Sequence, residues 1–185
     1  EALRLEREHM SQAKLDSATM FAATLTRLVP FIQTVAVTGS VAYGSAAKWD
    51  DIDIFIVTKC SRLWLSIFMA LLLVRVCKLF GLRAPHLSSF CLSYIHDEQG
   101  FADDSYRNRV NPLFARELLK AKPVAGAEEY RRLLQANEWV GKMYAGPYVA
   151  KLIDLEQSLK GRNSDWTKRR SSLMSSIVVD WAEAL

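Results

Sequence analysis

Apolar residues recur at helical spacing along residues 1–28, and a proline then ends the repeat. Leu5, Phe21 and Leu25 belong to it, among Glu and Arg residues, and Pro30 follows. The pattern predicts an amphipathic helix and lacks the continuous apolar segment of a signal peptide. We expect this N-terminal region, residues 1–30, to pack on the core that follows.

Two short apolar segments with a different pattern come next and predict neighbouring strands. Residues 32–38 read IQTVAVT, are rich in β-branched side chains, and run directly into Gly39 and a serine. Residues 51–58 read DIDIFIVT and alternate at their start, so the two aspartates share one face with Phe55 while the isoleucines share the other. We expect the isoleucine face to be buried.

Residues 63–82 form the most apolar stretch of the chain, reading LWLSIFMALLLVRVCKLFGL. Arg75 and Lys78 limit its uninterrupted apolar part to about 12 residues, fewer than the roughly 18 that a membrane span needs. We interpret it as a crossover helix that is buried on most faces. A transmembrane or interfacial segment and the seam of a homodimer are alternatives.

The remaining pattern predicts one more strand and then helices. Residues 88–95 read SSFCLSYI and precede a polar turn, HDEQG. This order indicates an α/β (α+β) fold in which a small mixed sheet, within a core of residues 31–110, is flanked by helices. A helical C-terminal region, residues 111–185, would form one compact unit with the core. Its predicted helices cover residues 111–121, 127–144, 148–160 and about 164 to the end.

The composition narrows the class of protein. The 185 residues are 50% hydrophobic and 24% charged, which excludes disorder and allows one substantial core. A net charge of +4 is compatible with an anionic ligand and gives no strong nucleic-acid signature. The three cysteines form no C-x-x-C pair, which excludes zinc ribbons, and their apolar surroundings favour reduced thiols and a cytoplasmic location.

The candidate chemistry lies between the first two strands. Gly39 allows a sharp turn and close approach of a ligand, and Ser40 adds a hydroxyl and an N–H where phosphate oxygens are favoured. Asp51 and Asp53 are hard oxygen ligands of the kind that Mg²⁺ takes. Each motif alone has an ordinary explanation, a turn or a solvated strand edge. Their combination is more informative, because aspartates are disfavoured in strands.

These residues resemble the DNA polymerase β-like nucleotidyltransferase superfamily. Its pattern is a hydrophobic strand, Gly-Ser or Gly-Gly, about nine to thirteen residues, and D-h-D or D-h-E on a second strand. Residues 39–54 read GSVAYGSAAKWDDIDI and also resemble stand-alone bacterial and archaeal members, which carry GS-x-A-x-G-x-A before SDIDI. Asp50 stands where serine is commoner.

The resemblance implies a reaction and assigns roles to four residues. Gly39 and Ser40 would bind the triphosphate of a nucleotide, with ATP as the expected NTP, and Asp51 and Asp53 would bind Mg²⁺ or Mn²⁺. The family transfers a nucleoside monophosphate to an acceptor and releases pyrophosphate. The acceptor here would be a hydroxyl of a small molecule, a protein or an RNA.

The sequence departs from the family at the next strand, where many members carry a further carboxylate that acts as metal ligand and base. SSFCLSYI has none, so Ser89 or Ser93 would occupy that position. Asp97 and Glu98 lie just past the strand and would reach the site only if the strand were shorter or shifted. The alternative function is therefore a catalytically weak or inactive nucleotide-binding module that retains the fold.

Other candidates are less specific. Basic residues near the core would neutralise phosphates, and Tyr43, Trp49, Tyr106 or Trp139 would stack a base, although core packing is the usual role of such aromatics. Arg131, Arg132 and the other basic pairs are typical of solvated helix faces. The basic candidates are Lys48, Lys59, Arg62, Arg75 and Lys78.

Overall fold

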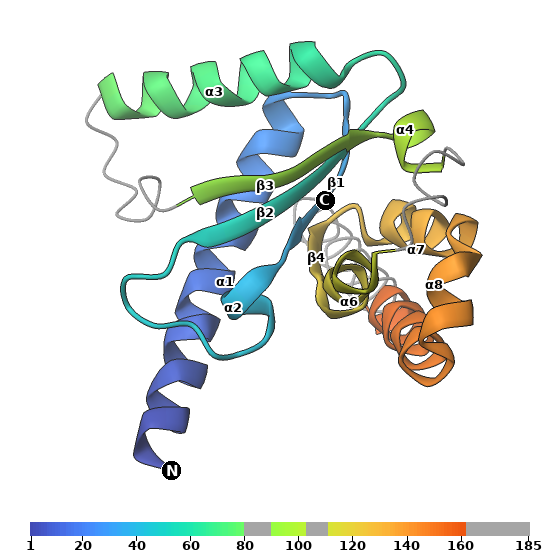
Figure 1. Cartoon of the computed structure of the whole chain (residues 1–185). Coiled ribbons are helices and arrows are strands. Elements are labelled where there is room, and N and C mark those ends of the chain that lie inside the picture. Colours follow the sequence, from blue (N-terminus) through green and yellow to red (C-terminus); the bar gives the residue numbers. More distant parts are fainter. Residues whose placement is uncertain (80–89, 103–110, 162–185) are drawn as a thin grey trace, which may run out of the picture.

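The computed structural model describes residues 1–79, 90–102 and 111–161. A long N-terminal helix, three strands with intervening helices, and a C-terminal group of helices with a fourth strand follow one another along the chain (Figure 1). The elements are α1 (Ala2–Leu28), β1 (Ile32–Val37), α2 (Gly39–Ala42), β2 (Ile52–Thr58), α3 (Leu63–Leu79), β3 (Phe90–Asp97), α4 (Glu98–Ala102), α6 (Pro112–Lys120), β4 (Lys122–Ala125), α7 (Ala127–Ala136) and α8 (Glu138–Met143), followed by a helix over residues 145–161.

The four strands form one mixed sheet in the order β3-β2-β1-β4. β1 pairs antiparallel with both β2 and β4, whereas β2 and β3 run parallel and α3 makes the crossover between them. The end of β1 and the start of β2 therefore lie at the same end of the sheet, with Val37 opposite Ile54. The mixed sheet flanked by helices confirms the predicted fold class.

Helices pack on both faces of the sheet. On one face Ile52, Ile54 and Ile56 pack with Leu25 of α1, as the alternation in the sequence predicts. On the other face Phe55 and its neighbours pack against α6, α7, α8 and the helix over residues 145–161. The alternation of β2 thus divides its side chains between two apolar layers, and Asp53 lies on the face of Phe55.

The structure differs from the expected elements in the second half of the chain. β3 continues through Asp97, and Glu98–Ala102 is a short helix, so the segment expected to be a polar turn is ordered secondary structure. Residues 122–125, expected as a break between helices, form β4 on the edge of the sheet. The helix expected over 127–144 is divided at Asn137 into α7 and α8. The helix expected from about 164 lies outside the described residues.

α3 is the predicted crossover helix, but the expectation that it is buried on most faces is wrong. Ser66 and Ala70 are buried toward the sheet, while Trp64, Phe68 and Leu71 are 80%, 63% and 56% exposed. α3 packs on β2 and β3 with its inner face. No other described element covers its outer face (Figure 1). Among the described helices, none combines the length and apolarity that a membrane span requires.

Candidate nucleotide site

The Gly-Ser turn and the Asp53 carboxylate meet at one end of the sheet. The Thr38 amide donates to the Asp53 backbone carbonyl at 2.9 Å, which aligns the end of β1 with the start of β2. Gly39 follows with φ +63°, and a Cβ added there would lie 2.1 Å from Asp53 Oδ2. Glycine is therefore required at this position both by the backbone conformation and by the neighbouring carboxylate.

Ser93 of β3 fixes the other oxygen of Asp53. Its hydroxyl donates to Asp53 Oδ1 at 2.6 Å. The ladder pairs Ile54 with Leu92 and Phe55 with Tyr94, so Ser93 is the extra residue of a β-bulge. Bulges redirect a side chain locally and are frequent beside active sites. Of the two candidate serines near this strand, Ser93 contacts Asp53, and Ser89 lies outside the described residues.

Asp51 is exposed and immediately precedes β2, which begins one residue later than the sequence suggests. The loop before it is attached to α1. The buried Lys14 ammonium donates to the backbone carbonyls of Ala47, at 2.7 Å, and Asp50. Ser11 Oγ accepts from the Ala46 amide at 3.0 Å. The N-terminal helix therefore holds the segment between the two motifs.

Asp50 has a structural role in the same loop. Its Oδ2 accepts from the Ala47 amide at 2.9 Å. This bond and a hydrogen bond from the Ser40 side chain lower the pKa of the Asp50 carboxyl, so it is ionised at neutral pH.

Sequence reasoning missed two residues of α6 that contact the Gly-Ser turn. Glu117 accepts from the Gly39 amide at 3.2 Å and from the Tyr43 hydroxyl at 2.9 Å. The Arg116 guanidinium lies over the Tyr43 ring, 5.0 Å from its centroid. Burial, and then the bond to Glu117, raise the pKa of Tyr43, which therefore keeps its proton as a donor. No local pattern in the sequence connects α6 to a turn more than seventy positions earlier.

Asp97 and Glu98 do not join the site. Asp97 pairs with Thr58 in the parallel β2–β3 ladder, five positions beyond Asp53 and therefore roughly 16 Å along the strand. Its Oδ2 accepts from the Ser61 amide at 3.4 Å. The shorter or shifted strand that would let these two carboxylates reach the site is not found, because β3 extends through Asp97 and carries both to the opposite end of the sheet.

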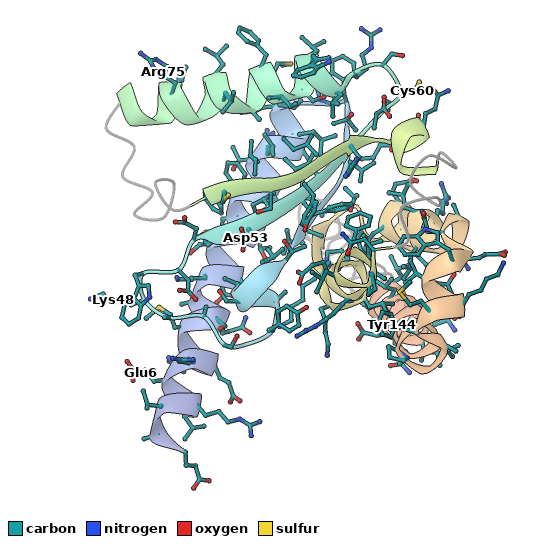
Figure 2. The ribbon with its side chains drawn as sticks, in the orientation of Figure 1. Glu6, Lys48, Asp53, Cys60, Arg75 and Tyr144 are labelled. Carbon is teal, nitrogen blue, oxygen red and sulfur yellow. The ribbon has the colours of Figure 1, made fainter. Side chains whose placement is uncertain are left out.

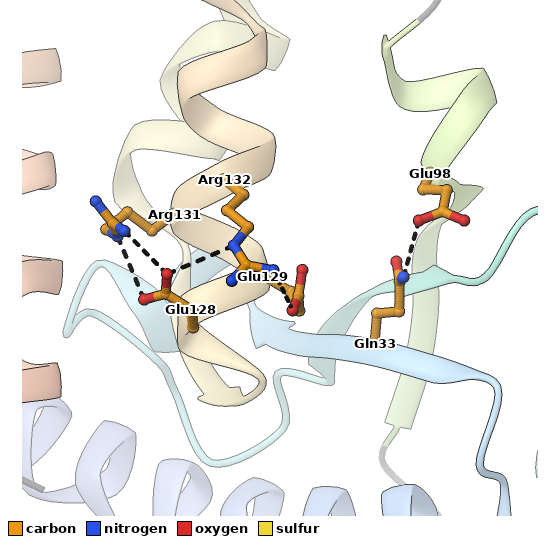
Figure 3. Close-up of polar contacts among 6 residues, drawn as sticks. All are labelled: Gln33, Glu98, Glu128, Glu129, Arg131 and Arg132. Carbon is orange, nitrogen blue, oxygen red and sulfur yellow. Dashed lines mark hydrogen bonds and ion pairs between the residues drawn. The ribbon is translucent and has the colours of Figure 1, made fainter. Parts of the chain in front are cut away.

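Glu98 is occupied there by two donors. It accepts from the Gln33 side chain at 2.8 Å (Figure 3). It also accepts from the Cys60 amide at 3.0 Å. Figure 2 labels Asp53, near the start of β2, and Cys60, two residues beyond its end. These contacts hold the loop that leads from β2 into α3, so Glu98 acts as a structural residue.

Most of the basic and aromatic candidates lie away from the turn. Arg131 and Arg132 form ion pairs with Glu128 and Glu129 on their own helix (Figure 3). The Arg62 guanidinium lies over the Phe31 ring, 5.3 Å from its centroid, beyond the opposite end of β2. The indole of Trp139 donates to Asn137 at 2.9 Å and stacks on Phe114. Lys48 and Trp49 are exposed in the loop before Asp51, and Tyr106 is outside the described residues.

The two cysteines whose side chains the structure describes are free thiols, Cys60 half-buried and Cys91 exposed. Cys91 is paired with Asp53 in the ladder and lies beside the site. The apolar surroundings of the cysteines in the sequence also predict thiols within the core, and this prediction is wrong for Cys91.

The donor set fits Mg²⁺ bound together with a nucleotide. Within the described part of the chain, no group of three or more His, Cys, Asp or Glu side chains is arranged to hold a metal alone. Mg²⁺ in proteins commonly uses one or two carboxylates, completed by substrate phosphates and water. Asp53, held by Ser93, and the exposed Asp51 supply two such carboxylates.

The comparisons with known proteins agree with the fold and the motif. Residues 20–135 match the model of the family described as Nucleotidyltransferase domain. The chain therefore belongs to the nucleotidyltransferase domain family of the polymerase β-like superfamily, as the resemblance predicted. Membership supports nucleotidyl transfer as the general class of activity.

Individual relatives add little. No curated protein matches the chain. A solved structure described as "Crystal structure of the toxin-antitoxin with AMP-PNP" is 12% identical, with a TM-score of 0.37, and the match covers 76% of this chain and 98% of that chain.

Proposed function

We propose that this protein transfers a nucleoside monophosphate from an NTP, with ATP as the first candidate, to an acceptor hydroxyl in a reaction that depends on Mg²⁺ or Mn²⁺. The acceptor oxygen forms a bond to the α-phosphorus, and the bond from that phosphorus to the bridging oxygen breaks. Pyrophosphate leaves with the electron pair, and the acceptor proton passes to solvent. The single observation that carries the proposal is the contact between Gly39 and the Asp53 carboxylate at the end of the sheet.

The chain's own residues would bind and orient the substrate. Gly39 lets the Asp53 carboxylate lie directly against the turn, and the Ser93 hydroxyl holds Asp53 in one orientation. Divalent metal, when bound, would neutralise charge on the phosphates and on the leaving oxygen. Positioning and charge stabilisation account for most of the catalysis of phosphoryl transfer, so the arrangement does not require a third carboxylate on β3.

One observation favours a second candidate, a nucleotide-binding module with weak or no transfer. The residue of β3 that faces Asp53 is a serine, which cannot act as the carboxylate base found in many relatives. Both candidates predict nucleotide binding, and only the first predicts labelled product or pyrophosphate.

The test of the proposed function compares Asp53→Asn with Asp154→Asn. Asn keeps the size of Asp53 and an acceptor for Ser93 but loses the negative charge, whereas Asp154 is 74% exposed on a distant helix. Each protein is incubated with α-labelled NTPs, Mg²⁺ or Mn²⁺ and candidate acceptors, including the protein itself. We expect transfer by the parent and by Asp154→Asn, and a loss of about 100-fold or more in Asp53→Asn.

Equal activity in the two variants would contradict the assignment of Asp53. Metal-dependent binding of nucleotide without any release of pyrophosphate would favour the second candidate.

A further inference from the structure

The Gly39 turn already binds an anion in this structure, and that anion belongs to the protein. The Glu117 carboxylate accepts from the Gly39 amide through Oε2 and from the Tyr43 hydroxyl through Oε1. Arg116 places a guanidinium over the same tyrosine. An amide N–H, a phenol O–H and a guanidinium are donors that a phosphate group also uses.

We infer that Glu117 occupies a phosphate subsite formed by Gly39, Tyr43 and Arg116, and that the triphosphate of the substrate displaces it. This inference rests on the proposed function, since it concerns the same turn. The Gly39 amide has one proton to donate and the Tyr43 hydroxyl has one. A phosphate and a carboxylate therefore compete for these donors, and they repel each other when both are close.

The structure allows this exchange without a change in the fold. Ala115 and Leu118 of α6 are 0% and 2% exposed and anchor the helix in the core on either side of Glu117. Glu117 is half-buried and Arg116 is exposed, so both side chains have access to solvent. Rotation of the Glu117 side chain toward solvent would free the two donors while α6 stays in place.

The two adjacent residues of α6 therefore act in opposite directions. Glu117 opposes the entry of a triphosphate because its carboxylate holds the same donors. Arg116 favours entry because a guanidinium pairs with phosphate oxygens, often through two parallel hydrogen bonds. Tyr43 serves either anion as a donor. A purely structural role for this cluster would predict weaker binding from a change at either position of α6.

The experiment measures binding of Mg²⁺–ATP and, separately, of tripolyphosphate with Mg²⁺ by isothermal titration calorimetry on the full chain. The tested variants are Glu117→Gln, Glu117→Asp and Arg116→Gln. Gln removes the charge, and Asp keeps the charge but is one methylene too short to hold both donors. Glu129→Gln is the control, because within the described part of the chain the ion pair of Glu129 is with Arg132 of its own helix, α7. Thermal unfolding followed by circular dichroism verifies that each variant is folded.

We expect Glu117→Gln to bind both ligands about tenfold more tightly, since the apparent affinity rises with the fraction of protein whose subsite is open. Glu117→Asp shifts the affinity in the same direction, and Arg116→Gln weakens binding by about tenfold. The Glu129→Gln control binds like the parent. This pattern supports the subsite and the competition.

Equal or weaker binding by both Glu117 variants, with binding by the parent intact, would overturn the inference and leave the proposed function standing. Unchanged binding in Arg116→Gln would remove Arg116 from the subsite. Absence of binding by the parent and by every folded variant would overturn both the inference and the proposed function.

Discussion

Gly39 illustrates how one residue can be required by two independent constraints. Its φ of +63° is costly for a residue with a side chain, and its missing Cβ leaves the place that Asp53 Oδ2 occupies. Gly44 lies five positions later with φ +72° and has open space around it. A side chain at either glycine strains the backbone, but only a side chain at Gly39 also clashes with the Asp53 carboxylate. Comparing substitutions at the two positions therefore distinguishes these two costs.

We predict that Gly39→Ala weakens Mg²⁺–ATP binding by at least about tenfold and destabilises the fold by about 1–2 kcal/mol more than Gly44→Ala does. The added methyl group must displace the Asp53 carboxylate, whereas the methyl group at position 44 meets no neighbour within 4 Å. Calorimetric titration and denaturant unfolding measure the two effects. If both alanine variants bind nucleotide equally, Asp53 does not need its observed position.

Sequence alone predicts that the Gly-Ser turn lies beside the two aspartates, because the turn follows one strand and the aspartates stand at the start of its neighbour. It does not predict Glu117, which is 78 positions from Gly39. Helix α6 is an ordinary amphipathic helix in the sequence, and nothing in its spacing shows which turn its polar side faces. Only the packing of α6 on the sheet brings Glu117 and Arg116 to the site.

At the scale of elements, the end of β3 shows why polar residues predict a turn where the chain forms a strand. His96 and Asp97 continue the strand because its partner β2 continues to Thr58. The His96 ring packs 6.2 Å from Phe55, and burial lowers the pKa of this histidine. The sequence does not predict β4 for a related reason, since Pro123 is a break signal in sequence but is compatible with an edge strand.

Glu98 makes stability at this end of the sheet dependent on pH. Hydrogen bonds from the Cys60 amide and the Gln33 side chain lower the pKa of the Glu98 carboxyl in the folded protein. The stabilisation by the Glu98 carboxylate is therefore fully present at neutral pH, which lies above the pKa of this carboxyl in the unfolded chain. This stabilisation is lost as the pH falls below about 4.5, the ordinary pKa of a glutamate, and then through the lower pKa that Glu98 has in the folded protein.

We predict that Glu98→Gln lowers the free energy of unfolding at pH 7 by about 1 kcal/mol or less, because solvent screens this half-exposed group. The difference from the parent should shrink toward acidic pH, where the parent carboxylate becomes protonated. Urea unfolding at several pH values between 7 and 3 measures it. A difference that grows on acidification would contradict the assigned direction.

At the scale of the whole molecule, the sheet lies between two layers of helices, and α3 presents a further apolar surface. Trp64, Phe68 and Leu71 lie on its outer side. The sequence raised the homodimer seam as an alternative for this helix, and we keep it as a proposal. These side chains lie on one face of one helix, and contiguous exposed apolar patches of this kind mark interaction sites, whereas single exposed apolar residues do not.

The proposal predicts that Phe68→Glu converts a dimer to a monomer, because the interface would bury a charge without a partner. Leu113→Glu is the matched control, since Leu113 is 69% exposed on α6 and lies away from α3. Analytical ultracentrifugation over a range of concentrations measures the mass. A parent chain that is monomeric at every concentration tested would refute the dimer.

The attachment of the 46–50 loop to α1 has a practical consequence for anyone who trims this protein. The family match begins at residue 20, yet Ser11 and Lys14, which hold this loop, come before it. The match ends at residue 135, while Lys151 donates to the Ala121 carbonyl from beyond it. A fragment cut to the family boundaries would retain all four motif residues and lose the anchors that hold their surroundings. The smallest unit worth producing is therefore defined by those anchors and extends past the motif on both sides.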